Sequence, residues 1–192
     1  MTHREALALI DTPHLRNLPG PTRWADLGCG SGTFTLALAD LLAPGSHIDA
    51  IDLKPAIAAQ TTTRGVTITP RTGDFTRLPL TNPAAAPGPR QPPLTDPDPQ
   101  SARLDGILMA NSLHYVRDQR TFLTHLRTST NILLLVEYDT DRPIARWVPY
   151  PLSFTTATHL LQSTGWPNVQ KLGTRPSAFG RAELYSALAP TP

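Results

Sequence analysis

The chain has 192 residues and a mass of 20.8 kDa, about the size of one domain, and 40% of its residues are hydrophobic, enough to build a core. Its formal net charge is only +2 and it has no run of Lys or Arg, so the charge pattern gives no support to a nucleic-acid partner. One cysteine excludes an intramolecular disulfide and a cysteine zinc site, and no apolar run approaches the roughly 20 residues that span a bilayer, so we expect a soluble, cytoplasmic protein without a metal site or a membrane partner.

Short apolar runs alternate with helical patterns along the chain, which is typical of a parallel sheet with helices on its faces. The first 21 residues contain a leading helix over residues 3–18, broken near Pro13. The spacing then predicts strands at 22–27, 46–53 and 66–70 and helices at 33–42 and 56–63. The second of these helices begins after Pro55, a residue that suits the first turn of a helix.

A proline-rich stretch interrupts this alternation. Eight prolines lie between residues 79 and 99, so neither a helix nor a regular strand is expected there. We interpret residues 79–102 as a surface loop inserted into a single domain. The loop is either a solvated connector or a flap beside an active site, since long loops often act as lids.

The second half of the chain resumes the pattern. We expect strands at 104–110, 131–138, 168–174 and 182–188 and helices at 117–128 and 154–164. The last two strands are joined by too few residues for a parallel crossover, which predicts an antiparallel hairpin. The sequence therefore predicts one domain over residues 1–192, with a Rossmann-like, doubly wound α/β fold. Its seven-stranded sheet is mostly parallel and has an antiparallel strand in the C-terminal hairpin.

A glycine loop follows the first predicted strand. Gly28, Gly30 and Gly32 stand at every second position, and Asp26 precedes them at the strand end. Such a loop lets the backbone turn tightly and approach a ligand, although a bare turn has the same pattern. In an open α/β sheet, ligands bind beyond the carboxyl ends of the strands, which is where this loop lies.

Two further acidic residues follow the next strands. Asp52 ends the second strand, 52 − 32 = 20 residues after Gly32, where a carboxylate can accept hydrogen bonds from both hydroxyls of a ribose. Asp74 follows the third strand and could accept a hydrogen bond from an exocyclic amine, with Phe75 against a base. The three strand ends together therefore suit a nucleoside ligand.

From about Thr22 onward the chain resembles the class I S-adenosylmethionine-dependent methyltransferases, through the successive motifs DLGCGSG, IDL, GDF and MANSLHYV. The resemblance implies S-adenosylmethionine as cofactor. It places the glycine loop at the methionine portion and the second strand end at the ribose. The third strand end would then meet the adenine, and the fourth the methionine end. The cofactor-binding residues expected on this basis are Asp26, Gly28, Cys29, Gly30, Gly32, Asp52, Leu53, Asp74, Phe75 and Asn111. One departure is the proline-rich stretch, which stands where a helix is expected after the third strand.

The segments after the fourth and fifth strands supply the candidate acceptor site. His114 is the candidate catalytic base, because an imidazole titrates near neutral pH; the alternative is that it only shapes the pocket. The candidate substrate residues are Tyr115, Glu137, Tyr138, Trp147 and Tyr150. Trp147 could equally anchor the following helix to the sheet.

The expected function is methyl transfer from S-adenosylmethionine to a small-molecule acceptor by in-line displacement. The alternatives are an RNA or protein methyltransferase and a non-catalytic S-adenosylmethionine-binding module. An NAD-dependent oxidoreductase is disfavoured because Thr33 stands where its fingerprint requires a third glycine. The sequence leaves the acceptor, the methylated atom and the oligomeric state open.

Overall fold

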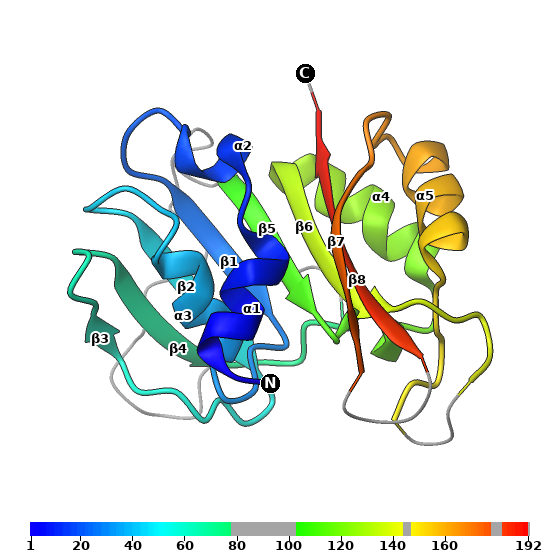
Figure 1. Cartoon of the computed structure of the whole chain (residues 1–192), viewed down its shortest axis with the longest axis horizontal. Helices are drawn as coiled ribbons and strands as arrows, with labels where there is room; N and C mark the ends of the chain where they lie inside the picture. Colours follow the sequence, from blue (N-terminus) through cyan, green and yellow to red (C-terminus); the bar gives the residue numbers. More distant parts are fainter. Residues whose placement is uncertain (78–102, 144–146, 178–181, 192) are drawn as a thin grey trace.

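The computed structural model describes residues 1–77, 103–143, 147–177 and 182–191 (Figure 1). One mixed sheet runs through this part of the chain. Its strands are β1 (Arg23–Leu27), β2 (His47–Asp52), β3 (Gln60–Thr61), β4 (Thr67–Thr72), β5 (Leu104–Ala110), β6 (Thr130–Tyr138), β7 (Gln170–Pro176) and β8 (Glu183–Pro190). They lie in the order β3-β4-β2-β1-β5-β6-β8-β7. The pairings from β4 through β2, β1 and β5 to β6 are parallel, so the carboxyl ends of five strands meet at one edge.

Helices cover both faces of this sheet. They are α1 (His3–Ile10), α2 (Pro13–Arg16), α3 (Thr33–Ala39), a 3-10 helix η1 (Leu113–Tyr115), α4 (Gln119–Ser129) and α5 (Phe154–Ser163). Figure 1 shows α1 and α3 together on the near face and α4 and α5 together on the other. A separate apolar core fills each face, one around Trp24 and the other around Trp166. This arrangement confirms the doubly wound fold.

The central strand β6 shows why its sequence is apolar without interruption. Leu134 packs into the core beneath α1 and α3, whereas its neighbours Leu133 and Leu135 pack into the core beneath α4 and α5. A strand that is covered on both faces buries successive side chains in opposite directions. The continuous run therefore marks a central strand of the sheet.

The C-terminal hairpin is confirmed. β8 pairs antiparallel with both β6 and β7. The break in the leading helix is also confirmed, because α1 ends at Ile10 and α2 begins at Pro13.

The helix predicted over residues 56–63 is wrong. That segment holds the two-residue strand β3, in which Gln60 and Thr61 pair antiparallel with β4, so the sheet has eight strands in the described residues rather than seven. Pro55 suits a helix start, but three consecutive threonines from Thr61 to Thr63 favour extended backbone, and pairing with β4 supplies backbone hydrogen bonds. The local pattern was overridden by a tertiary contact.

The proline-rich insertion predicted at residues 79–102 lies outside the described residues. Within the described ranges, no helix has both the length and the apolar character needed to cross a membrane.

Candidate functional site

The glycine loop after β1 is held in a left-handed backbone conformation. Gly28 has φ +85°, and a Cβ atom there would overlap the Cβ of Ser112. Gly30 has φ +51° and donates its N–H to Oδ2 of Asp52 at 3.0 Å, while a Cβ atom there would meet no protein atom within 4 Å. Glycine is thus required at position 28 by packing, whereas position 30 faces open space.

Asp26 lies under this loop with one carboxylate oxygen unused. The side chain is buried, and its Oδ2 accepts a hydrogen bond from the Thr35 hydroxyl at 2.6 Å. Its Oδ1 is buried and has no hydrogen-bond partner among the described residues. The pKa of the carboxyl is raised from 3.8 to about 7, mainly by burial; the hydrogen bond from Thr35 lowers it, and the negative charge of Asp52 adds to the rise.

Asn111 presents a second unused oxygen at the end of β5. It is the one non-glycine residue of the described chain with a positive φ, at 55°, and its N–H donates to the Val136 carbonyl at 2.8 Å. Its side-chain Oδ1 is buried and also lacks a partner within the described ranges. A strained backbone and an unsatisfied buried acceptor commonly mark a functional position.

These two residues share a cavity of about 330 Å³, which we call the loop cavity. Its lining residues are Met1, Asp26, Gly28, Cys29, Gly30, Ser31, Thr33, Phe34, Ala110 and Asn111. Two buried acceptor oxygens without donors favour a ligand that brings a charged N–H group, such as a protonated amine.

A second cavity of about 230 Å³ adjoins the first, and we call it the hairpin cavity. Its lining residues are Met1, Glu5, Asn111, Tyr138, Arg175, Pro176, Ser177 and Leu184. Met1 and Asn111 line both cavities, so the two cavities are neighbours beyond the carboxyl end of β5.

His114 forms a buried pair with Glu137. The Nδ1 atom of His114 lies 2.6 Å from one carboxylate oxygen of Glu137, and the backbone N–H of His114 donates to the other oxygen at 3.2 Å. Both side chains are at most 2% exposed. In the neutral tautomer that carries its proton on Nδ1, the ring donates a hydrogen bond to Glu137, and Nε2 is then an acceptor. The pair can therefore either accept a proton or fix the turn between β5 and α4.

Residues 25–131, more than half of the chain, match a family model described as a methyltransferase domain. The chain belongs to the class I S-adenosylmethionine-dependent methyltransferases. No curated protein matches the sequence significantly.

Solved structures with low sequence identity share the fold of this methyltransferase. The N-terminal domain of EvdMO1, with SAH bound, is 17% identical, with a TM-score of 0.59 over 99% of this chain and 81% of that one. An arsenic (III) S-adenosylmethionine methyltransferase from Chlamydomonas reinhardtii is 16% identical, with a TM-score of 0.63 over 97% and 71%. Magnesium protoporphyrin IX methyltransferase from Synechocystis PCC 6803, with bound SAM, is 16% identical, with a TM-score of 0.61 over 97% and 79%.

The loop cavity of the methyltransferase fits the cofactor of the family. The methionine portion of S-adenosylmethionine carries a protonated amine, and the unused oxygens of Asp26 and Asn111 are acceptors for such a group. The open space above Gly30 admits a ligand close to the backbone. The residues present therefore match the chemistry of the cofactor.

The other predicted cofactor residues of the methyltransferase lie at the neighbouring strand ends. The Asp52 carboxylate accepts hydrogen bonds from the backbone N–H groups of Gly30 and Lys54. The neighbouring Leu53 side chain is 67% exposed. Asp74 caps its own turn by accepting the Thr76 N–H and hydroxyl and pairs with Arg77 at 3.0 Å. Phe75 is buried in the core under Gly28, so its ring supports the glycine loop from below.

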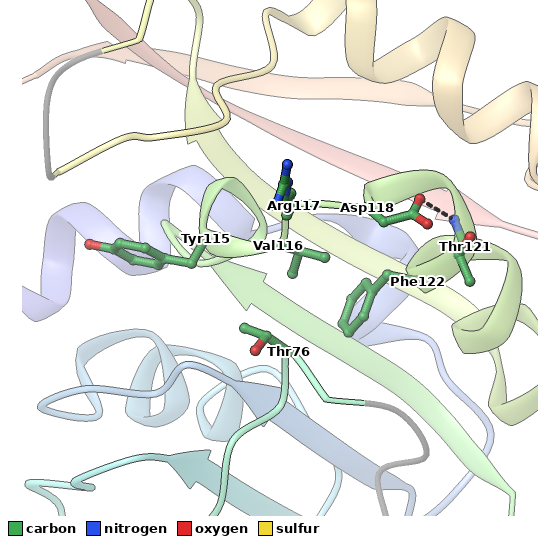
Figure 2. Close-up of a pocket in the computed structure, with 7 residues that line it drawn as sticks. All are labelled: Thr76, Tyr115, Val116, Arg117, Asp118, Thr121 and Phe122. Carbon is green, nitrogen blue, oxygen red and sulfur yellow. Dashed lines mark hydrogen bonds between the residues drawn. The ribbon is translucent and has the colours of Figure 1, made fainter.

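The predicted substrate residues are divided between different places. Tyr138 lines the hairpin cavity, whereas Tyr115 lines a third cavity of about 350 Å³ between η1, the start of α4 and Thr76 (Figure 2). This third cavity shares no lining residue with the other two. Trp147 and Tyr150 are exposed and line none of these three cavities, although Tyr150 donates its N–H to the His114 carbonyl at 3.0 Å.

Glu5 and Arg175 of the hairpin cavity were missed by the sequence analysis. They are 170 residues apart and join by a bond of 2.6 Å between Arg175 Nη2 and Glu5 Oε1. No local motif marks such a pair, because neither residue lies at a predicted strand end beside the glycine loop.

Proposed function

We propose that this methyltransferase transfers a methyl group to a small molecule bound in the hairpin cavity. The observation that carries the proposal is that Asn111 and Met1 line both this cavity and the loop cavity. An acceptor in one space would then lie next to a cofactor in the other. The hairpin cavity, at about 230 Å³, is smaller than the roughly 300–1,000 Å³ of drug-sized ligand sites, which favours a compact acceptor.

Within this proposal, the strand ends hold the cofactor by its polar groups. Asp26 and Asn111 bind the amine of the methionine portion, Asp52 accepts hydrogen bonds from the ribose, and Asp74 borders the adenine, while Phe75 supports the glycine loop from the core. Cys29, Leu53 and the loop glycines complete the walls. Bound S-adenosylmethionine supplies an already activated methyl group, so the main task of the protein is to align the acceptor with it.

We assign His114 and Glu137 as positioning residues. Glu137 forms hydrogen bonds with both the side chain and the backbone of His114. His114 lies three residues after Asn111, which follows the end of β5. The imidazole is buried and lines none of the three cavities. Its ring centre lies 4.4 Å from that of Tyr115, in the third cavity, and 6.0 Å from that of Tyr138, in the hairpin cavity. The pair therefore supports the acceptor wall from behind.

The substrate class is tested by methyl transfer to a fractionated cell extract. Labelled S-adenosylmethionine is incubated with the protein and with low-mass, RNA and protein fractions separately. We expect label in the low-mass fraction alone, and Asp52→Ala to reduce it by weakening cofactor binding. Label in the RNA or protein fraction would contradict the proposal.

The role of His114 is tested by two replacements that each place an amide group near the position of one ring nitrogen. Asn at this position keeps a donor near Nδ1 for Glu137, whereas Gln keeps a polar group near Nε2. A positioning role predicts that His114→Asn retains turnover within about threefold and the wild-type pH profile, while His114→Gln loses more than tenfold. Turnover and its pH profile are measured with the acceptor found in the low-mass fraction. Loss of more than tenfold in both variants, with a changed pH profile of the remaining turnover, would instead identify Nε2 as a general base, because neither amide side chain can accept a proton.

A further inference from the structure

We propose that Arg175 binds a carboxylate of the methyl acceptor, which makes the substrate a small organic acid. This inference rests on the proposed use of the hairpin cavity for the acceptor. The carboxylate would be the handle by which the acid is held, and the methylated atom would lie at its other end, near Asn111.

The first argument is an unused donor of the Arg175 guanidinium. Its Nη2 donates to Oε1 of Glu5 at 2.6 Å. Its Nη1 is shielded from solvent and has no hydrogen-bond partner within the described residues. The Arg175 side chain as a whole is 31% exposed, but this nitrogen is buried, and a buried N–H group is costly to leave unpaired. A ligand oxygen in the hairpin cavity would accept the missing hydrogen bond from Nη1, since Arg175 lines that cavity.

The second argument is that both carboxylate oxygens of Glu5 already accept hydrogen bonds from donors other than Nη1. The Oε2 oxygen accepts the backbone N–H of Thr2 at 2.7 Å in the capping box of α1. The hydrogen bond from Arg175, together with the bonds from Thr2, lowers the pKa of Glu5 to about 2, so it stays ionised. Glu5 therefore fixes the guanidinium from one side and leaves the second nitrogen for another acceptor.

The third argument is the character of the remaining wall. Tyr138, Pro176 and Leu184 present largely apolar surface to the same cavity. A guanidinium binds a carboxylate with matching planar geometry, and an apolar wall favours a ring or a short alkyl body. The occupant that matches both features is a compact acid with an apolar body.

The position of the hairpin cavity indicates that Arg175 binds the carboxylate of the acceptor and not the carboxylate of the cofactor's methionine portion. Arg175 stands on β7 and faces residues of α1, β6 and β8, whereas no residue of the glycine loop lines the hairpin cavity. The loop cavity in turn does not include Arg175. We therefore assign Arg175 to the acceptor.

The experiment measures binding of acid and amide pairs by calorimetry, with S-adenosylhomocysteine at saturation. The probes are benzoate, 4-hydroxybenzoate and phenylacetate, each compared with its amide. We expect at least one acid to bind wild type about tenfold more tightly than its amide. Arg175→Met should remove that preference, and Arg175→Lys, which keeps the charge but not the planar fork, should remove most of it.

Arg4→Met is the matched control, since Arg4 is exposed on the same helix as Glu5 and its loss changes the net charge equally. It should keep the acid preference. All variants should bind S-adenosylhomocysteine within about twofold of wild type, which also shows that they are folded. The inference is overturned if no acid binds better than its amide, or if Arg175→Met and Arg175→Lys lose about tenfold in S-adenosylhomocysteine affinity, which would assign Arg175 to the cofactor.

These outcomes are distinct from failure of the proposed function. A wild-type protein that binds the acids but methylates no low-mass compound would overturn the proposed function and leave the carboxylate site in place.

Discussion

Asp26 is the residue whose protonation should govern cofactor binding. It is buried beside the loop cavity, with one oxygen unpaired in the described structure and a pKa raised to about 7. A cationic amine is attracted by the carboxylate and not by the neutral acid. In the ligand-free protein the two forms are therefore nearly balanced at neutral pH.

We predict that affinity for S-adenosylhomocysteine rises with pH between 6 and 8. Below about 7 the Asp26 carboxyl holds a proton that must leave when the amine binds, so affinity should fall by up to about tenfold per pH unit on the acid side. Calorimetric titrations at pH 6, 7 and 8 measure this. In Asp26→Asn the affinity should be lower and nearly independent of pH over this range; an unchanged slope in that variant would exclude Asp26 as the titrating group.

The same substitution should stabilise the ligand-free protein. Because the folded-state pKa lies above the ordinary value of 3.8, the unfolded chain binds fewer protons between pH 4 and 7, and the folded state loses stability as pH rises through that window. Asp26→Asn removes this loss, so its midpoint of thermal unfolding should exceed that of wild type at pH 8 and match it more closely near pH 4.

At the level of elements, the loop between β1 and α3 separates glycines that look equivalent in the sequence. Gly28 is closed in by Ser112, whereas Gly30 faces space beside the loop cavity. Replacing each by alanine should therefore affect different properties of the protein.

We predict that Gly28→Ala lowers the free energy of unfolding by about 2–3 kcal/mol, because a methyl group overlaps Ser112 at a positive φ. Gly30→Ala should cost only about 1 kcal/mol, from its positive φ, but should weaken S-adenosylhomocysteine binding at least tenfold. Urea unfolding and calorimetric titration measure the two effects. Equal losses of stability in both variants would show that the loop responds as a unit.

Elements with strong local patterns could be predicted from the sequence. β5 and the hairpin strands were found because buried strands carry apolar runs and a short connector forbids a parallel crossover. The edge strand β3 was not found, since two exposed residues carry no periodic signal and their pairing with β4 is a tertiary contact.

For the site, too, local sequence patterns could not reveal contacts between distant elements. Asp26 and Gly30 could be named because they adjoin a strand end in one motif. The pairing of Glu5 with Arg175 depends on how α1 packs against β7, which no local pattern reveals. Tyr115 and Tyr138 both follow strand ends, yet they line different cavities.

At the scale of the whole molecule, the sheet separates two cores but also joins them. Trp24 lies in the core beneath α1 and α3, and Trp166 in the core beneath α4 and α5; neither side chain is exposed to solvent. Trp147 is 75% exposed, so its fluorescence does not follow the unfolding of either core. Because β6 contributes side chains to both cores, we expect the described chain to unfold as one unit.

The test uses two variants that each retain a single buried tryptophan, with Trp147→Phe in both. Fluorescence of Trp24 and of Trp166 should give unfolding midpoints that agree within about 2 °C, and saturating S-adenosylhomocysteine should raise both equally. Circular dichroism of the same variants controls for the substitutions. Two separated midpoints, or a ligand shift seen by one tryptophan only, would divide the protein into independent units.

The position of Met1 has a practical consequence for experiments on this protein. Its side chain borders both cavities, whereas β8 ends at Pro190 on the opposite edge of the sheet, as the N and C marks in Figure 1 indicate. An affinity tag fused ahead of Met1 would therefore lie beside both cavities. Tags, surface immobilisation and fluorescent labels therefore belong after the last strand, where they leave the binding edge open.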